Sequence, residues 1–259
     1  MKRRFVALST VVELAVDEQL GISELAAFLI DAYPTTDTPP AIAYHLHDRV
    51  MSAVDRYDDP VADVDDLVPL FELDLYQQVA ERAPPGWLLH AATLERDGRA
   101  FVFAGPSGAG KTTLTLALMA RGWRLVTEEM TLVDRELRVH GLARPIHADR
   151  TSDVPPSWRA CVYPIRGGST RKVLAHPPSA QRVNAPLPLA AIARIDHGPD
   201  ATNDLVVLPP QAAITRLWDA ALRKDDDGLA AAVAIAGGSR VLDLRSRSID
   251  SAIALAERI

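Results

Sequence analysis

The sequence predicts an α/β fold with a mixed sheet, preceded by a small α+β part. Apolar runs of strand length alternate with helix-like segments over its 259 residues. A glycine-rich stretch, "GPSGAGKTT", stands between the apolar runs "AFVF" and "LTLALMA", which is the strand-to-helix setting of a phosphate-binding loop. Asp97-Gly98 separates two further apolar runs and predicts a two-residue hairpin turn.

The first part, residues 1–84, is predicted to contain two strands and two helices. We expect a strand over 5–14, a helix over 23–33 with Ser23 as its N-cap, a strand over 41–47 and a helix over 70–83. "APPGW", residues 83–87, ends this part, because two prolines and a glycine are typical of a linker. The acidic residues between Asp55 and Asp74 are expected to form a solvated loop and helix face, with a docking surface for a basic partner as the alternative.

The second part, residues 85–259, carries the hairpin, the glycine-rich loop and further alternating elements. The helix after the loop is expected to end at Gly122, a residue suited to a left-handed cap. Strands are then expected over 124–126, 189–196, 204–208 and 240–244, and helices over 210–224, 228–236 and 250–259.

The loop fits the pattern G-x-x-x-x-G-K-[ST], which has a chemical reason at each position. The glycines let successive backbone N–H groups face phosphate oxygens, and the helix that follows adds its positive dipole end. Lys111 can supply a charge to the outer phosphates, and the Thr112 hydroxyl can ligate Mg²⁺. The residues expected to bind nucleotide are Gly105, Pro106, Ser107, Gly108, Ala109, Gly110, Lys111, Thr112 and Thr113.

The hairpin predicts a functional position for His90. If Asp97-Gly98 forms the turn, Arg96 faces Arg99, and the same register sets His90 opposite Gly105. A bulge would move this register by one residue. His90 is therefore a candidate catalytic residue at the mouth of the loop, and a satisfied core histidine is the alternative.

Two acids follow the next predicted strand. A strand "RLV" parallel to the strand before the loop would end at the same edge of the sheet, so Glu128 and Glu129 would lie beside the phosphates. One could hold Mg²⁺ while the other accepts a proton from an attacking hydroxyl. Asp134 is the competing acid, and "VDRELRV" predicts that it lies in a hairpin turn at the far edge.

Composition and charge limit the classes of function. The net charge of −6 argues against a general nucleic-acid binder. No apolar run reaches the length of a membrane span, and Glu13 and Asp17 come too early for a secretory signal, so we expect a cytoplasmic protein with no membrane partner. The single cysteine, Cys161, excludes an internal disulfide and is expected to be a buried thiol. Assembly into homo-oligomers stays open.

Basic residues without acidic neighbours occupy a long segment of the second part. Residues 154–195 contain no Asp or Glu but several Arg and Lys, so this segment could attract nucleotide or phosphorylated product, or it could be a solvated loop. One further cation is expected near a transferred phosphate, with Arg144, Arg166 and Arg171 as candidates.

The stretch from Leu88 to Asp134 resembles the catalytic core of the HPr serine kinase/phosphorylase family. It is most similar to the short HPr-kinase-like proteins encoded beside peptide natural-product genes, including lasso-peptide precursor kinases. The match rests on His90, the loop from Gly105 to Thr112, the run from Arg121 to Leu125, and the pair Glu128-Glu129. The resemblance implies a P-loop kinase core related to phosphoenolpyruvate carboxykinase. It also implies transfer of a phosphoryl group from ATP, with Mg²⁺, to a serine hydroxyl of a peptide or protein.

The chain also departs from the family pattern. Glu128 and Glu129 stand where the family usually has two aspartates, and "GLARPIHADRT" (residues 141–151) is the counterpart of a proline-containing segment in which Arg144 would contact substrate or phosphate. The C-terminal regulatory signature of longer members is absent, which argues against HPr itself as the substrate. The alternatives are a small-molecule kinase and a nucleotide-binding assembly protein without phosphotransfer; phosphate removal is also a family activity.

Overall fold

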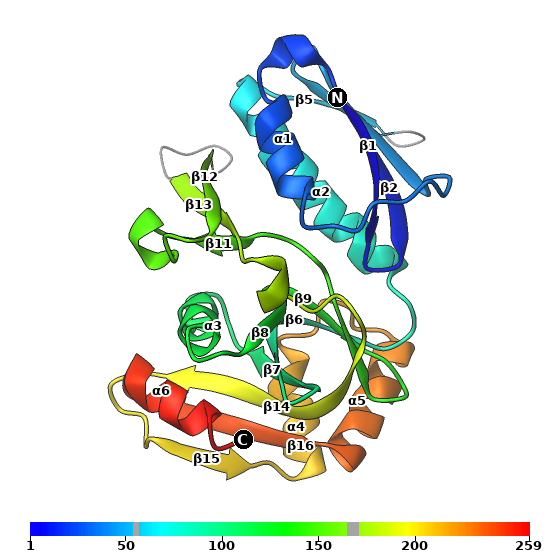
Figure 1. The fold of residues 1–259 in the computed structure, drawn as a ribbon. Helices are drawn as coiled ribbons and strands as arrows, with labels where there is room; N and C mark the ends of the chain where they lie inside the picture. Colours follow the sequence, from blue (N-terminus) through cyan, green and yellow to red (C-terminus); the bar gives the residue numbers. More distant parts are fainter. Residues whose placement is uncertain (54–56, 165–170) are drawn as a thin grey trace. The chain divides into compact units, whose positions relative to one another are not determined.

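The computed structural model describes residues 1–53, 57–164 and 171–259, which form two compact units (Figure 1). One unit comprises Met1–Ala83 with Ala143–His176, and the other comprises Pro84–Leu142 with Pro177–Ile259. Both units contain helices and strands, and the five-stranded and eight-stranded sheets mix parallel and antiparallel pairs. The predicted α/β class with mixed sheet is therefore confirmed.

The first unit contains a five-stranded sheet in the order β1-β2-β3-β4-β5. The strands are β1 (Lys2–Ala7), β2 (Thr10–Val16), β3 (Ile42–His47), β4 (Val50–Ala53) and β5 (Tyr57–Pro60). Only β2 and β3 are parallel, and the helix α1 (Ser23–Ile30) lies in the connection between them, as a parallel pair requires a crossover. Ile42, Tyr44 and Leu46 are all buried, which confirms the predicted alternation of that strand.

Two local predictions in this unit are wrong. The expected strand over 5–14 is a hairpin, because the chain turns at Leu8 with φ of 58° and β1 pairs antiparallel with β2. The turn residues are Leu8 and Ser9, and serine is a weaker turn signal than glycine, asparagine or proline. Ser23 is the first residue of α1 rather than its N-cap, a position held by Ile22.

The helix α2 (Leu67–Arg82) buries acidic side chains that were expected to be solvated. Tyr44 donates a hydrogen bond of 2.7 Å from its hydroxyl to Asp74, and its ring meets Phe71 edge to face. Glu72 is also largely enclosed, with 14% of its side chain exposed. The solvated interpretation therefore fails for these two acids, because each has a donor partner in the same unit. Asp55 lies outside the described residues.

A second sheet of the first unit comes from a later part of the chain. It has the order β11-β13-β12, formed by β11 (Ile146–Ala148), β12 (Arg159–Pro164) and β13 (Arg171–His176). The sequence predicts that residues 143–176 belong to the second part, whereas the structure groups them with residues 1–83. The physical reason is that this segment has its own sheet, whose polar side chains contact α2 and α1.

The second unit is built on an eight-stranded mixed sheet with the path β10-β9-β6-β7-β14-β16-β15, and β8 also pairs with β6. The strands are β6 (Trp87–Arg96), β7 (Arg99–Ala104), β8 (Arg124–Thr127), β9 (Met130–Val133), β10 (Arg138–Gly141), β14 (Leu187–His197), β15 (Asp204–Val207) and β16 (Arg240–Ser246). β14 is parallel to both β7 and β16. These two parallel pairs bring the carboxyl ends of three strands to one edge.

Helices cover both faces of this sheet. The helices are α3 (Lys111–Met119), α4 (Pro210–Trp218), α5 (Asp226–Gly238) and α6 (Ile249–Ala256). Ala213 of α4 and Ile235 of α5 share a core with Val102 of β7. The neighbouring residues Phe101 and Phe103 contact Trp123, which follows α3, and successive strand residues point to opposite faces. α3 therefore lies on the face away from α4 and α5.

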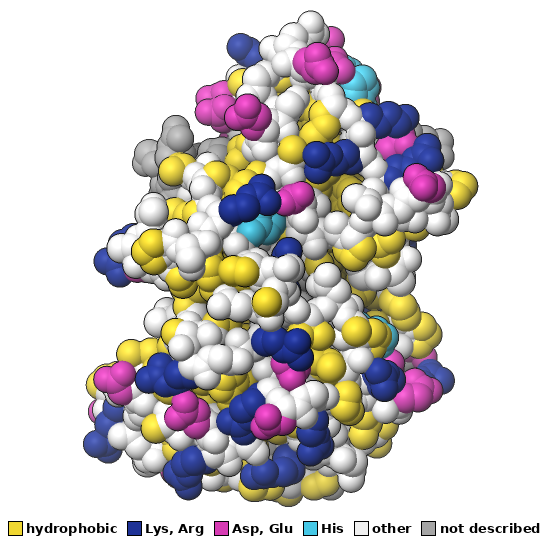
Figure 2. Space-filling view, in the orientation of Figure 1, with side chains coloured by type: hydrophobic (Ala, Val, Ile, Leu, Met, Phe, Trp, Pro, Cys, Tyr) yellow, Lys and Arg dark blue, Asp and Glu magenta, His cyan; other side chains and the backbone are white. Residues whose placement is uncertain are grey.

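Within the described ranges the fold also has short 3-10 helices at Glu18–Leu20, Val64–Asp66, Thr151–Asp153 and Ser179–Gln181. No helix among the described residues is long and apolar enough to cross a membrane. On the face drawn in Figure 2, basic and acidic side chains are interspersed. Ion pairs between such side chains in the second unit include Arg124 with Glu95 and Arg121 with Glu257.

Candidate active site

The glycine-rich loop connects the end of β7 to the start of α3, as the motif predicts. Gly108 and Gly110 have φ of 79° and 86°, a left-handed backbone that favours glycine. A Cβ on Gly105 would lie 3.1 Å from the Cβ of Ala109, so this position also favours a residue without a side chain. Residues 106–108 are exposed. The loop is thus an open turn at a helix N-terminus, a form suited to phosphate.

Lys111 folds back over this loop. Its Nζ donates hydrogen bonds of 2.8 Å to the carbonyl oxygen of Gly105 and 3.0 Å to that of Pro106. Burial lowers the pKa of Lys111, and the charges of Glu129 and Glu128 oppose this shift. The ammonium group is therefore held at the loop. A phosphate bound to the loop could replace the two carbonyl oxygens as its hydrogen-bond acceptor.

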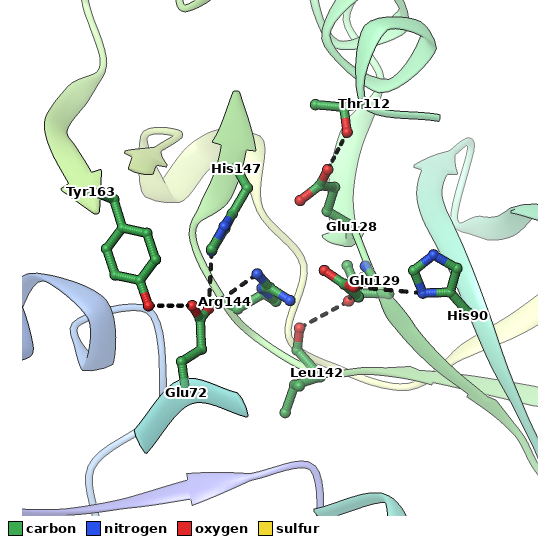
Figure 3. A network of polar contacts seen from close by, with 10 residues as sticks. Glu72, His90, Thr112, Glu128, Glu129, Leu142, Arg144, His147 and Tyr163 are labelled. Carbon is green, nitrogen blue, oxygen red and sulfur yellow. Dashed lines mark hydrogen bonds and ion pairs between the residues drawn. The ribbon is translucent and has the colours of Figure 1, made fainter. Parts of the chain in front are cut away.

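Glu128 follows β8 and meets the first turn of α3. The Thr112 hydroxyl donates a hydrogen bond to its carboxylate (Figure 3), and Glu128 is 7% exposed. Because β6 is antiparallel to both β7 and β8, the last two strands run in the same direction. The predicted placement of Glu128 at the edge that carries the loop is confirmed, although β6 stands between the two strands.

Glu129 points to the other candidate, His90. Its Oε1 lies 3.6 Å from Nδ1 of His90 (Figure 3), and each side chain is 30% exposed. The predicted hairpin register is confirmed from Arg96↔Arg99 to Ala91↔Ala104, which leaves His90 opposite Gly105 at the next position. Asp97 and Gly98 have φ of 54° and 75°, the two left-handed residues of a type I′ turn. Their sequence therefore fixes where the imidazole lies.

The competing acid, Asp134, belongs to a hairpin turn. Its Oδ1 accepts hydrogen bonds from the backbone N–H groups of Glu136 and Arg138, and its Oδ2 lies 2.8 Å from Nε2 of His140. These contacts close the connection between β9 and β10. The prediction that Asp134 lies in a turn, away from the loop, is confirmed.

Arg144 belongs to the first unit, where it forms part of a buried cluster around Glu72. Its guanidinium lies 3.0 Å from the Glu72 carboxylate, which also contacts Nε2 of His147 at 2.9 Å and the hydroxyl of Tyr163 at 2.6 Å (Figure 3). These contacts join α2 to β11 and β12. A contact of Arg144 with substrate stays a prediction. Arg166 and the side chain of Arg171 lie outside the described residues.

The Glu72 cluster predicts a loss of stability in acid. Burial alone would raise the pKa of Glu72, but Arg144 and His147 outweigh it and lower the pKa from 4.5 to about 2. Because the folded pKa is the lower one, Glu72 stabilises the fold fully above pH 4.5, and this contribution is lost as the pH falls towards 2. Glu72→Gln should lower stability by about 3 kcal/mol at neutral pH and flatten the acid dependence. Chemical unfolding at several pH values checks this, and an equal acid slope in both proteins would contradict it.

A pocket of about 520 Å³ opens beside the start of the loop. The pocket is lined by His90 and residues 105–107, together with Arg194, Arg216 and Asp219. Sequence reasoning missed the last three. Arg194 pairs with Ala104 because β14 is the neighbour of β7, and no local sequence pattern predicts that strand order.

The donor set partly fits a magnesium nucleotide. No group of three or more His, Cys, Asp or Glu that could hold a metal occurs among the described residues. Thr112 and Glu128 nevertheless bring a hydroxyl and a carboxylate together, and Mg²⁺ commonly takes only one or two protein ligands with phosphate oxygens and water. These two residues are the ones that would hold the ion. No protein-family model matches the chain, and no curated protein matches its sequence.

Proposed function

We propose that the chain is an ATP- and Mg²⁺-dependent kinase that transfers the γ-phosphoryl group to a serine hydroxyl of a peptide or protein. A precursor peptide of a ribosomal natural product is the acceptor that the family resemblance suggests. The observation that carries the proposal is the gathering of four side chains around one phosphate-binding loop: Thr112 with Glu128, and His90 with Glu129. The HPr-kinase family that the sequence resembles has a similar set, with two aspartates in place of Glu128 and Glu129.

The two glutamates suit different tasks. Glu128 accepts a hydrogen bond from the Thr112 hydroxyl, so we assign it to the binding of Mg²⁺. Thr112 and Glu128 would hold Mg²⁺ there, and the ion would supply positive charge that offsets the charge of the nucleotide phosphates. Glu129 faces His90, so we assign it as the base, with the imidazole orienting its carboxylate.

The transfer step then follows from these positions. The serine oxygen forms a bond to the γ-phosphorus, the bond from that phosphorus to the β–γ bridging oxygen breaks, and the serine proton passes to Glu129. Lys111 and the loop N–H groups stabilise the charge on the leaving ADP and on the transferred group. Little covalent work is required of the protein, because positioning and charge supply most of the acceleration.

A small-molecule kinase is the second candidate, and the pocket beside the loop favours it. Its volume of about 520 Å³ is within the range of pockets that bind small ligands. A nucleotide-binding assembly protein without phosphotransfer is the third candidate. It would bind ATP and tolerate the loss of both glutamates.

Calorimetric titration with ATP, with and without Mg²⁺, tests the nucleotide site. We expect one ATP per chain, bound more tightly with Mg²⁺, and we expect Glu128→Gln to remove most of the magnesium effect while ATP still binds. Glu136→Gln is the matched control, because Glu136 is an exposed acid in the turn after β9. Failure of the wild-type protein to bind ATP would refute the proposed function.

A further inference from the structure

Arg194 and Arg216 line the same pocket as the start of the phosphate-binding loop. Arg194 is the strand neighbour of Ala104, the last residue of β7, so its backbone lies directly beside the start of the loop. Arg216 comes from α4, on the sheet face that carries the shared core. Both arginines also line an adjoining hollow of about 410 Å³ with Gln211 and Thr215. The lining of the pocket therefore combines the start of the loop and His90 with two arginines.

A buried carboxylate lies near both arginines. Asp243 of β16 is the strand neighbour of Arg194 and is 1% exposed. Its oxygens lie 4.0 Å from Arg194, 4.0 Å from Arg216 and 3.6 Å from Arg245. These distances exceed those of charge-assisted hydrogen bonds. Among the described residues, Oδ1 of Asp243 has no hydrogen-bond partner.

The long contacts leave donor capacity on the guanidinium groups. A guanidinium presents a planar fork of N–H groups that matches a carboxylate or phosphate. Asp243 orients Arg194 and Arg216 by charge without taking up their donors in short hydrogen bonds. Asp219 also lines the pocket, so the charges around the pocket are not all positive. The pocket is suited to one oxyanion at a defined position.

We propose that Arg194 and Arg216 bind the phosphoryl acceptor through a carboxylate or phosphate group that the acceptor carries near its hydroxyl. The inference rests on the proposed kinase function, and it names the class of acceptor. An oxyanion seated on the two arginines would direct the neighbouring hydroxyl towards His90 and the loop. Asp243 is then a positioning residue that acts through the arginines.

Binding of small oxyanions to the protein saturated with Mg-ADP tests this assignment. Mg-ADP binding is measured first and separately, and its absence would refute the proposed function. Inorganic phosphate and malonate are then titrated by calorimetry, because one represents a phosphate source and the other a carboxylate source. We expect at least one of them to bind with one site per chain, and the preferred probe identifies the oxyanion.

Substitutions decide whether the arginines form that site. Arg194→Gln and Arg216→Gln should weaken binding at least about tenfold and leave Mg-ADP affinity unchanged, and Arg194→Lys should weaken it less. Arg135→Gln is the matched control, because Arg135 is exposed and paired with Asp227 elsewhere in this unit. If one arginine variant fails to fold, the other still gives the answer, since Arg216 is half exposed. The inference would be overturned if neither oxyanion binds, or if both glutamine variants bind the oxyanion with wild-type affinity. Loss of binding in Lys111→Ala alone would also overturn it.

Discussion

Lys111→Ala is expected to abolish phosphoryl transfer, with a loss of roughly 10³-fold or more in kcat/KM. The Lys111 ammonium lies over the loop, bonded to the carbonyl oxygens of Gly105 and Pro106. It is the one lysine in the loop motif, and alanine removes the ammonium group that would meet the charge that develops during transfer. ATP affinity should fall as well, because the same ammonium contacts the outer phosphates before the reaction.

The control for this variant is Lys224→Ala. Lys224 is an exposed lysine of the same unit, so its loss changes the net charge equally without touching the loop. Circular dichroism and thermal unfolding would show that both variants keep the fold. Transfer in Lys111→Ala at more than about a tenth of the wild-type rate would remove this lysine from the mechanism.

The glutamate pair gives the second large effect. Glu129→Gln keeps the shape of the side chain and removes its charge, so we expect kcat to fall about 100-fold or more, with ATP affinity close to that of wild type. Glu128→Gln should also lower kcat, and it should raise the Mg²⁺ concentration needed for half-maximal rate, because Glu128 is the carboxylate bonded to Thr112. Steady-state kinetics at several Mg²⁺ concentrations separate the two roles.

Glu136→Gln serves again as the exposed control for both variants. His90→Gln should resemble Glu129→Gln if the imidazole orients that carboxylate across the 3.6 Å contact. Full activity in either glutamine variant at 128 or 129 would exclude that carboxylate from the reaction. Full activity in both would favour the assembly-protein alternative.

The sequence was most informative where a local signal fixes geometry. Asp97-Gly98 is sufficient to set the hairpin register, and that register brings His90 to the loop. The direction of β8 likewise follows from the hairpin and the helix after the loop, and it brings Glu128 to Thr112. In both cases a few covalently connected residues determine the outcome.

Other features depend on contacts that no local pattern encodes. Leu8 adopts a left-handed conformation in a turn marked only by Ser9, so the sequence predicts one strand where the chain forms a hairpin. Arg194 reaches the loop only through the order of β7, β14 and β16. The segment 143–176 joins the first unit through contacts between side chains that are far apart in the sequence, such as Arg144 with Glu72. Tertiary pairing of this kind is set by the whole fold.

The most direct test of the central claim is the mass of acceptor peptides after incubation with Mg-ATP. The panel would contain serine peptides with and without a neighbouring carboxylate or phosphate, each beside its serine-to-alanine counterpart. We predict that serine peptides with a neighbouring carboxylate or phosphate gain one phosphate group, that the alanine counterparts do not, and that Lys111→Ala removes the gain. Tight binding of Mg-ATP without any change in mass across the serine peptides would contradict transfer to a peptide serine.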